Sequence, residues 1–541
     1  MNLSLQNKPA AQDRILETGA AEDDGGAGLI GAWMPTADDY AEAVRRRNKQ
    51  FLIGGSLLAA AVAAAFAALD NLVLPLVLLA AFMLPILLWQ FPRAALYLVL
   101  ASACLFELAQ MGGSDGNPYA DSLTDRIPIF WNVNTILQIY GHINFKAVPL
   151  NLLELLLIIA GGCALIRSAY TQTATFQAGV LIWPIGIYTG FVLLAWGVGM
   201  ETGGDFKISL QEIRSQLYFG LAYLMALNMV RERKQLVGVL WVVALCIGFK
   251  GILLTFRRYV TLQGMPLPDQ GVGAHEEAFF FDAFIAILLS LSVCKTLPKL
   301  RGVMLALLPF VLLGSVACNR RAGTAAFIVI LPLLVLAAYQ ALPKSRRLIL
   351  LTTAVCMVLF TGYYEAFKSS NLILAQPARA INSQFSPDPR DASSNAYRDA
   401  ENADLMATIR SAPLGYGYGK RMLHAVPIAD ISDRYEWWDI MTHNQVLWVW
   451  MRVGTFGFAA FWMMVSAILI CGAQVVRSQS ADIETKSLAI AGMMIVGSLM
   501  IFGLLDLQFS NFRDMLFAGI WSGILAALPG LKTPTARNSP T

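Results

Sequence analysis

The sequence predicts an all-α protein that crosses a membrane many times. Of its 541 residues, 57% are hydrophobic and only 14% are charged, whereas soluble domains carry about 25% charged residues. Apolar runs of about 20 residues, the length that a helix needs to span a bilayer, recur along the chain. Because these runs are continuous rather than alternating, they predict spanning helices and not the strands of a barrel.

About fourteen runs are candidate spans, and a count of twelve is also compatible with the pattern. The first two runs are separated only by Asp70 and Asn71, which predicts either a tight hairpin or a re-entrant segment. The candidate spans cover about 51–69, 72–90, 94–111, 148–166, 180–200, 208–229, 235–256, 276–296, 302–318, 321–341, 348–366, 446–472, 487–505 and 513–530.

The basic residues predict how the chain is oriented. Lysine and arginine crowd short connections on one side, as in "RRRNK" (45–49), "RERK" (231–234) and "KSRR" (344–347). By the positive-inside rule this side is cytoplasmic. Both termini then lie in the cytoplasm, which requires an even number of spans. The net charge of +4 is too small to indicate nucleic-acid binding.

This threading divides the chain into six regions, the most unusual of which is a long polar segment on the outer side. A connection of that length between spans is uncommon unless it folds or functions. Within it, residues 393–413 have helical periodicity, which predicts one or two short helices over the membrane face. The regions are a cytoplasmic tail (1–50), N-terminal spans (51–200), central spans with arginine sites (201–366), a large periplasmic loop (367–445), C-terminal spans (446–530) and a cytoplasmic tail (531–541).

Histidine is rare and falls on the predicted outer side. The four histidines are His142, His275, His424 and His443. They are dispersed and form no HxxxH or HExxH spacing, so we expect no metal site. The seven cysteines lie in or beside apolar runs and predict neither a disulfide nor a metal site.

His443 heads an apolar run in "MTHNQVLWVWMRVG", where it either caps the helix or serves as a general base near neutral pH.

Several arginines are not explained by topology. Arg214 lies a turn or two inside a span, where an arginine costs up to ~2.5–3.5 kcal/mol. It either snorkels, pairs with Glu212 or another carboxylate, or binds an anion. Arg320 and Arg321 open a helix on the outer side, where a bidentate guanidinium and free helix N–H groups favour phosphate. Interfacial anchoring is the alternative for this pair.

Two further features are weaker signals. Arg257 and Arg258 follow a span on the outer side and fit either a lipid phosphate or plain interfacial anchoring. "APLGYGYGKR" (412–421) lacks the spacing of a nucleotide-binding loop, so its glycines predict tight backbone turns.

One imidazole together with several arginines at the outer ends of helices suggests glycosyl transfer. The arginines would hold a departing pyrophosphate, and the base would activate a sugar hydroxyl.

Four stretches in order resemble the superfamily of O-antigen ligases and lipid-linked polysaccharide polymerases, over about residues 205–530. "EIRSQLYFGLAYLMALNMV" resembles its arginine-bearing helix. "NRRAGTAAFIVIL" resembles its serine–arginine segment, although the usual serine is absent. "YRDAENADLMATIRSAPLGYGYG" resembles its Arg-then-PLGxGxG loop, and "THNQVLWVWMRVGTFGF" resembles its HNxxL…GxxG helix.

This resemblance implies a metal-independent, type C glycosyltransferase without a cofactor, in a bacterial inner membrane with its active site facing the periplasm. The donor would be a glycan on undecaprenyl pyrophosphate. His443 would activate the acceptor hydroxyl, and Arg214 with Arg320 or Arg321 would hold the pyrophosphate. Arg398 and Asn444 are weaker candidates from the same motifs.

Several functions remain compatible with these motifs. A polymerase would join exopolysaccharide or O-antigen repeats, whereas a ligase would transfer the glycan to lipid A–core. We favour the polymerase because the extended first third and the long outer loops leave room for a second large glycan. The expected partners are the lipid-linked donor, a sugar acceptor, membrane lipid and a chain-length regulator. A flippase for lipid-linked oligosaccharide, which would need internal repeats and polar residues at mid-membrane, and a scaffold subunit are the alternatives of other classes.

Overall fold

In the described part of the chain, all regular secondary structure is helical, and helices occur in each of the fourteen segments predicted as spans. Among the described residues, eight helices are long and apolar enough to cross a membrane, or nine if the bent pair Met83–Gln90 and Arg93–Leu105 is one span. The predicted count of twelve or fourteen therefore stays a prediction. The Asp70–Asn71 connection lies outside the described residues. The computed structural model describes residues 37–67, 83–106, 150–171, 176–263, 272–273, 276–318, 320–370, 372, 375–387, 389–432 and 437–531.

Polar residues at the ends of apolar segments fix where several helices begin. Asp205, Asn444, Asp482 and Asn511 each accept a backbone N–H in the first turn of the helix that follows. The helices are α1 (Ala37–Ala67), α3 (Pro92–Leu105), α5 (Leu152–Thr171), α6 (Ile182–Glu201), α7 (Phe206–Met229), α8 (Arg233–Phe256), α9 (Glu277–Cys294), α10 (Pro298–Cys318), α11 (Arg321–Ala341), α12 (Arg346–Phe367), α13 (Gln376–Phe385), α14 (Pro389–Ser411), α15 (Gln445–Arg477), α16 (Ile483–Gly503) and α17 (Phe512–Ala527), with a π-helical turn, η2 (Arg257–Thr261), and short 3-10 turns η3 (Pro343–Ser345) and η5 (Leu528–Gly530).

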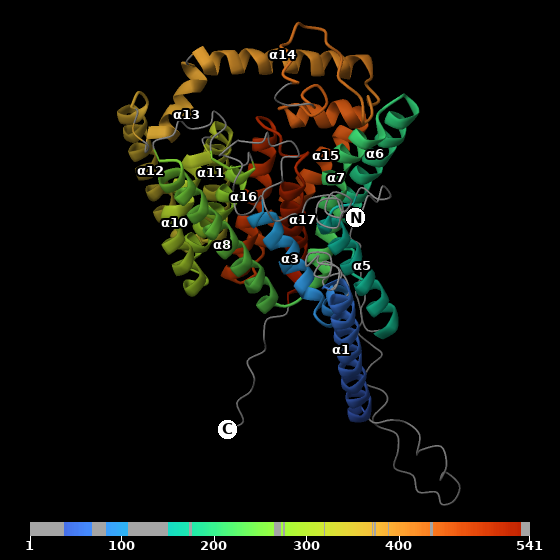
Figure 1. Ribbon diagram of the computed structural model, residues 1–541. Coiled ribbons are helices and arrows are strands. Elements are labelled where there is room, and N and C mark those ends of the chain that lie inside the picture. Colours follow the sequence, from blue (N-terminus) through green and yellow to red (C-terminus); the bar gives the residue numbers. More distant parts are fainter. Residues whose placement is uncertain are drawn as a thin grey trace, which may run out of the picture.

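The long polar region contains the two helices α13 and α14. Figure 1 shows α14 lying across one end of the helical bundle, joined through α13 to the top of α12 and reaching over α15 and α6. The prediction of helices over this face is confirmed. The helix α14 has 23 residues and is longer than the short helices that periodicity alone predicted. It covers the end of the bundle at which α15 begins.

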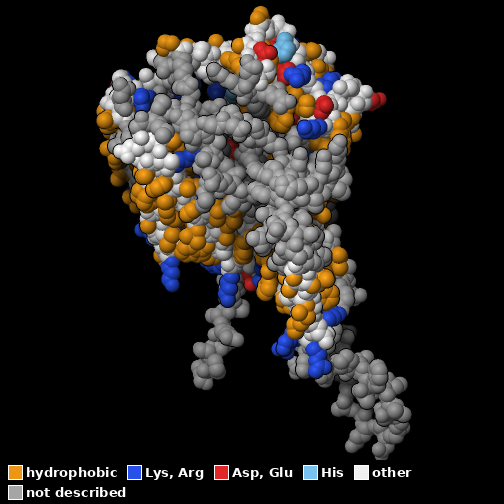
Figure 2. All heavy atoms as spheres, in the orientation of Figure 1, with side chains coloured by type: hydrophobic (Ala, Val, Ile, Leu, Met, Phe, Trp, Pro, Cys, Tyr) orange, Lys and Arg blue, Asp and Glu red, His pale blue; other side chains and the backbone are white. Residues whose placement is uncertain are grey.

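The charged side chains are distributed unevenly along the bundle axis. Figure 2 shows a wide apolar belt, with lysine and arginine gathered at the end opposite α14 and mixed charges with histidine near α14. An apolar belt between two polar ends is typical of a multi-pass membrane protein. The cytoplasmic placement of the basic end remains a prediction from the positive-inside rule.

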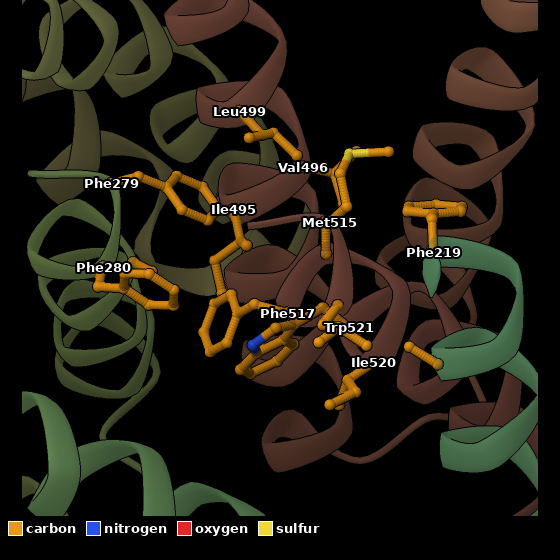
Figure 3. Close-up of a cluster of buried hydrophobic side chains, with 14 of the residues drawn as sticks. Phe219, Phe279, Phe280, Ile495, Val496, Leu499, Met515, Phe517, Ile520 and Trp521 are labelled. Carbon is orange, nitrogen blue, oxygen red and sulfur yellow. The ribbon is translucent and has the colours of Figure 1, made fainter. Parts of the chain in front are cut away.

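The core lies where α7, α9, α16 and α17 meet. Gly519 and Gly523 let α17 approach α7 closely, since a Cβ on them would lie 2.4 Å from the Phe219 carbonyl oxygen and 2.5 Å from that of Tyr223. This contact holds α7, the helix that carries Arg214, rigidly in the bundle. The side chains of the core in Figure 3 include Phe219, Phe279, Phe280, Ile495, Val496, Leu499, Met515, Phe517, Ile520 and Trp521.

Several charged groups inside this core are paired. The guanidinium of Arg513 lies 2.9 Å from Glu276 and 2.7 Å from Glu277, and Lys250 lies 3.5 Å from Glu277. Arg513 and Lys250 also donate to the carbonyl oxygens of Ala103 and Leu105, at the C-terminal end of α3. These cations satisfy carbonyl groups that a helix leaves without intrahelical partners.

Candidate functional site

The outer part of α15 is a short helical segment set off by a break at Gly454. This glycine has φ 71° and ψ 179°, a conformation that favours glycine. The chain from Pro413 to Gly417 enters the break, because Tyr416 donates to the Met451 carbonyl oxygen (2.8 Å) and Thr455 donates to that of Pro413 (2.9 Å). Positive φ values recur in this loop, and they confirm the predicted tight glycine turns, at Gly415, Gly417 and Gly419.

His443 lies immediately before this segment and contacts α14. Its backbone N–H donates to Glu401 Oε2 at 3.0 Å, and its Nδ1 lies 3.2 Å from Glu401 Oε1. The Glu401 side chain is 1% exposed, whereas that of His443 is 27% exposed. Asn444 caps α15 by accepting the N–H of Leu447 at 3.1 Å. The histidine is therefore not the helix cap, because its neighbour performs that function.

Tyr397 lies one helical turn before Glu401 on α14 and packs edge-on against the imidazole, with ring centroids 5.9 Å apart. Burial raises the pKa of Tyr397, and the charges of Glu401, Asp439 and Asp430 raise it further. The phenol thus stays protonated at physiological pH and is available as a hydrogen-bond donor.

Arg320 and Arg321 differ in their surroundings. Arg320 is the N-cap of α11, and its Nε and Nη2 are buried without a hydrogen-bond partner in the described part of the chain. Burial lowers the pKa of this guanidinium, the nearby Asp506 and Glu276 raise it, and Arg398 lowers it. Arg321 instead donates to Ser383 Oγ of α13 at 3.1 Å. Of the two arginines, Arg320 is the one with buried N–H donors that have no hydrogen-bond partner among the described residues.

Arg214 pairs with a carboxylate inside the helix bundle. Its side chain is buried and lies 3.3 Å from Glu154 of α5. Tyr218, one turn further along α7, donates a hydrogen bond to the same carboxylate. Glu212, suggested as a partner for Arg214, instead pairs with Arg452. The expectation that Arg214 pairs with a carboxylate is therefore confirmed, and that carboxylate is Glu154.

The connection between α16 and α17, residues 504–511, links the elements that carry the candidate residues. Gln216 of α7 donates to the Phe509 carbonyl oxygen at 2.8 Å. Gln445, two residues after His443, accepts the N–H of Ser510 at 3.0 Å. Asp506 is close enough to Arg320 to raise its pKa. Hydrogen bonds from this connection thus link the arginine-bearing α7 to the start of α15.

The remaining candidates are Arg257, Arg258 and the three other histidines. Arg257 is buried in η2, and its Nη2 has no hydrogen-bond partner among the described residues, whereas Arg258 lies over the Tyr259 ring, 5.8 Å from the centroid. His424 contacts Asp404 and Trp438, away from Glu401. His142 and His275 lie outside the described residues. No group of three or more metal-binding side chains is found within the described ranges.

Residues 303–462 match a protein-family model described as O-antigen ligase. We call this segment, which is similar to that family, the O-antigen ligase-like domain. It contains the start of α11, α14, the loop with Gly415, Gly417 and Gly419, and the part of α15 before Gly454. The search of curated proteins found no match.

Within the O-antigen ligase-like domain, sequence reasoning did not select Glu401, Tyr397 or Arg452. The spacing of Tyr397 and Glu401 puts them on one face of a helix, which the sequence does show. It does not show that this face meets His443, which follows 42 residues after Glu401. Glu154, the partner of Arg214, was missed for the same reason and lies outside the matched segment.

Proposed function

We propose that this protein is a membrane glycosyltransferase that moves a glycan from undecaprenyl pyrophosphate to a sugar hydroxyl at the periplasmic face of a bacterial inner membrane. The O-antigen ligase-like domain supports the general class of function. The contacts of individual residues support the chemistry, because His443 has a carboxylate partner and Arg320 has buried N–H donors without a partner among the described residues. The proposed reaction needs no metal, because arginines supply the positive charge at the leaving group.

In the proposed reaction, Nε2 of His443 accepts the proton of the acceptor hydroxyl. The hydroxyl oxygen forms a bond to the anomeric carbon of the donor glycan, and the bond from that carbon to the pyrophosphate oxygen breaks. Undecaprenyl pyrophosphate leaves with the electron pair, and its negative charge is stabilised by guanidinium groups. His443 then releases the proton to water, which returns the imidazole to its neutral form.

One observation carries this proposal: Nε and Nη2 of Arg320 are buried at the start of α11 and have no hydrogen-bond partner among the described residues. Burying an N–H group without a partner costs free energy of about 1–3 kcal/mol. The proximity of Arg398, which lowers the pKa of Arg320, adds repulsion. Arg398 directly follows Tyr397, whose ring contacts His443. A pyrophosphate would satisfy these donors and offset the repulsion between the two guanidinium groups.

We favour polymerisation of exopolysaccharide or O-antigen repeats over ligation to lipid A–core, because the extended first third of the sequence and the long loops expected on the outer side would give room for a second lipid-linked glycan. The acceptor would then be a sugar hydroxyl of a lipid-linked repeat, and a chain-length regulator would act as a partner. Both reactions use the same leaving group, so the site residues have the same assigned roles in either case.

The test is the length of glycan on a gel, from cells that lack this protein and are complemented with wild type or with His443→Ala. Single repeats in place of a ladder, without the protein or with the variant, would support the polymerase. A normal ladder that is retained on undecaprenyl pyrophosphate and absent from lipid A–core would identify a ligase. A wild-type glycan profile with an expressed His443→Ala protein would overturn the proposed function of this site.

A further inference from the structure

The helix α14 presents two buried carboxylates, one turn apart, to two histidines from other parts of the chain. Glu401 accepts the backbone N–H of His443 and faces Nδ1 of the same residue. Asp404 accepts the backbone N–H groups of Ala425 and Val426, at 2.7 and 2.8 Å, and faces Nδ1 of His424 at 3.3 Å. The two pairs have the same construction, but only the first contains the proposed base.

An ionised carboxylate accepts hydrogen bonds and cannot donate them. Both oxygens of Glu401 lie within 3.3 Å of Nδ1 of His443, so a neutral imidazole in this position carries its proton on Nδ1. The lone pair then lies on Nε2, the nitrogen on the far side of the ring. In this tautomer the outward nitrogen can accept a proton from a hydroxyl group.

We propose that Glu401 is a positioning residue for His443: it holds the imidazole in the Nδ1–H tautomer and stabilises the imidazolium that forms when Nε2 takes up a proton. This inference rests on the proposed function, in which His443 is the base. The backbone contact adds a second restraint, since one carboxylate holds both the ring and the main chain of His443. A charge-assisted hydrogen bond of this kind is stronger than a neutral one.

The burial of Glu401 makes its restraint on the imidazole of His443 effective. Glu401 is almost inaccessible, at 1% exposure, so water does not compete for its oxygens, whereas His443 keeps 27% of its side chain exposed. The inner edge of the imidazole is therefore fixed by protein. The structure fixes the orientation of the ring through α14, and movement of α14 would change the geometry of the base.

The replacement Glu401→Gln separates this role from packing. The amide oxygen of glutamine can still accept the backbone N–H of His443, but its NH₂ group would face Nδ1. Nδ1 would then have to accept, and the proton would move to Nε2, which could no longer act as a base. Replacing the triad aspartate of trypsin by asparagine has this effect and lowers kcat about 10⁴-fold. We expect Glu401→Gln to lower kcat by about 10³–10⁴-fold.

Asp404→Asn is the matched control on the same helix. Both backbone donors of that pair bind Oδ1 of Asp404, and the asparagine oxygen keeps these bonds. The change therefore affects only the face towards His424, and we expect activity within a few-fold of wild type. Glu401→Asp, which keeps the charge, is expected to retain more activity than Glu401→Gln.

The experiment uses the full chain in lipid nanodiscs and donor glycan isolated on undecaprenyl pyrophosphate from cells that lack this protein. Release of undecaprenyl pyrophosphate gives kcat, and ¹⁵N NMR of histidine-labelled protein gives the tautomers, since the chain has only four histidines. We expect the His443 signal, assigned by its absence in His443→Ala, to change from Nδ1–H to Nε2–H in Glu401→Gln, and to stay Nδ1–H in Glu401→Asp.

Activity near the wild-type level in Glu401→Gln, with His443→Ala inactive, would overturn the positioning role and leave the proposed function standing. An unchanged tautomer in an inactive Glu401→Gln would also overturn it, because the loss would then be structural. Full activity of His443→Ala would refute the proposed function itself. If Glu401→Gln does not fold, Glu401→Asp decides the question, since a His443 tautomer other than Nδ1–H in that variant would contradict the inference.

Discussion

Glu212 Oε1 lies 2.7 Å from Arg452 Nη2, and both side chains are completely buried. The second oxygen of Glu212 accepts the N–H of Gly419 at 2.6 Å, and Arg452 also donates to the carbonyl oxygens of Gly417 and Ile440, each at 2.9 Å. A single ion pair thus ties α7, the glycine loop and the outer part of α15 together. It fixes the helix of Arg214 relative to the chain around His443.

Removing one partner of this pair is expected to destabilise the protein strongly. In Arg452→Met, Glu212 would be left buried without its cation, and breaking a buried pair in this way costs about 3–5 kcal/mol. The free energy of unfolding in detergent measures the loss. The double variant Arg452→Met/Glu212→Gln is expected to recover part of it, because the uncompensated charge is gone. A single variant as stable as wild type would show that the pair does not hold these elements together.

Gly454→Ala is expected to disrupt the break in α15. A Cβ at this position would lie 2.2 Å from the backbone carbon of Leu414, and the φ of 71° is unfavourable for alanine. Strain at such a position costs about 1–3 kcal/mol before the clash is added, so we expect a lower melting temperature and loss of transfer. Gly362→Ala in α12 is the control, since a Cβ there meets nothing within 4 Å. Equal behaviour of the two variants would contradict the role of the break.

Arg320→Lys is expected to reduce kcat/KM for the donor by about 10–100-fold, because lysine cannot reproduce the bidentate fork and a hydrogen bond to a charged group contributes about 1.5–3 kcal/mol. Arg321→Lys is expected to have a smaller effect on the donor, since Arg321 already binds Ser383. Steady-state kinetics at varied donor concentration distinguish the two. The reverse order of effects would assign the phosphate contact to Arg321.

Chelation of divalent ions is expected to leave the rate unchanged. The proposed leaving group is neutralised by guanidinium groups, which need no metal to stabilise a pyrophosphate. Transfer measured with and without EDTA tests this directly. A loss of activity that one particular divalent ion restores would show that a metal shares the site.

The sequence was sufficient for features that depend on local pattern. Apolar runs located the helices, the periodicity of 393–413 located α14, and glycine spacing located the positive-φ turns. The ion pairs were not predictable in this way. Glu401 and His443 are 42 residues apart, and which carboxylate meets which cation depends on how helices pack. The sequence likewise left the partner of Arg214 open between Glu212 and another carboxylate, because Glu212 is near in sequence but faces Arg452 in the fold.

Arg214 has two possible contributions, to stability through Glu154 and to donor binding, and a double-mutant cycle separates them. Arg214→Gln is expected to destabilise the protein by about 3–5 kcal/mol, since it leaves the buried carboxylate of Glu154 without its cation. Adding Glu154→Gln removes that charge and is expected to restore much of the stability. If Arg214 holds the pyrophosphate, kcat/KM for the donor stays low in the double variant even though much of its free energy of unfolding is restored. Recovery of both stability and donor kcat/KM in the double variant would show that the ion pair is structural only.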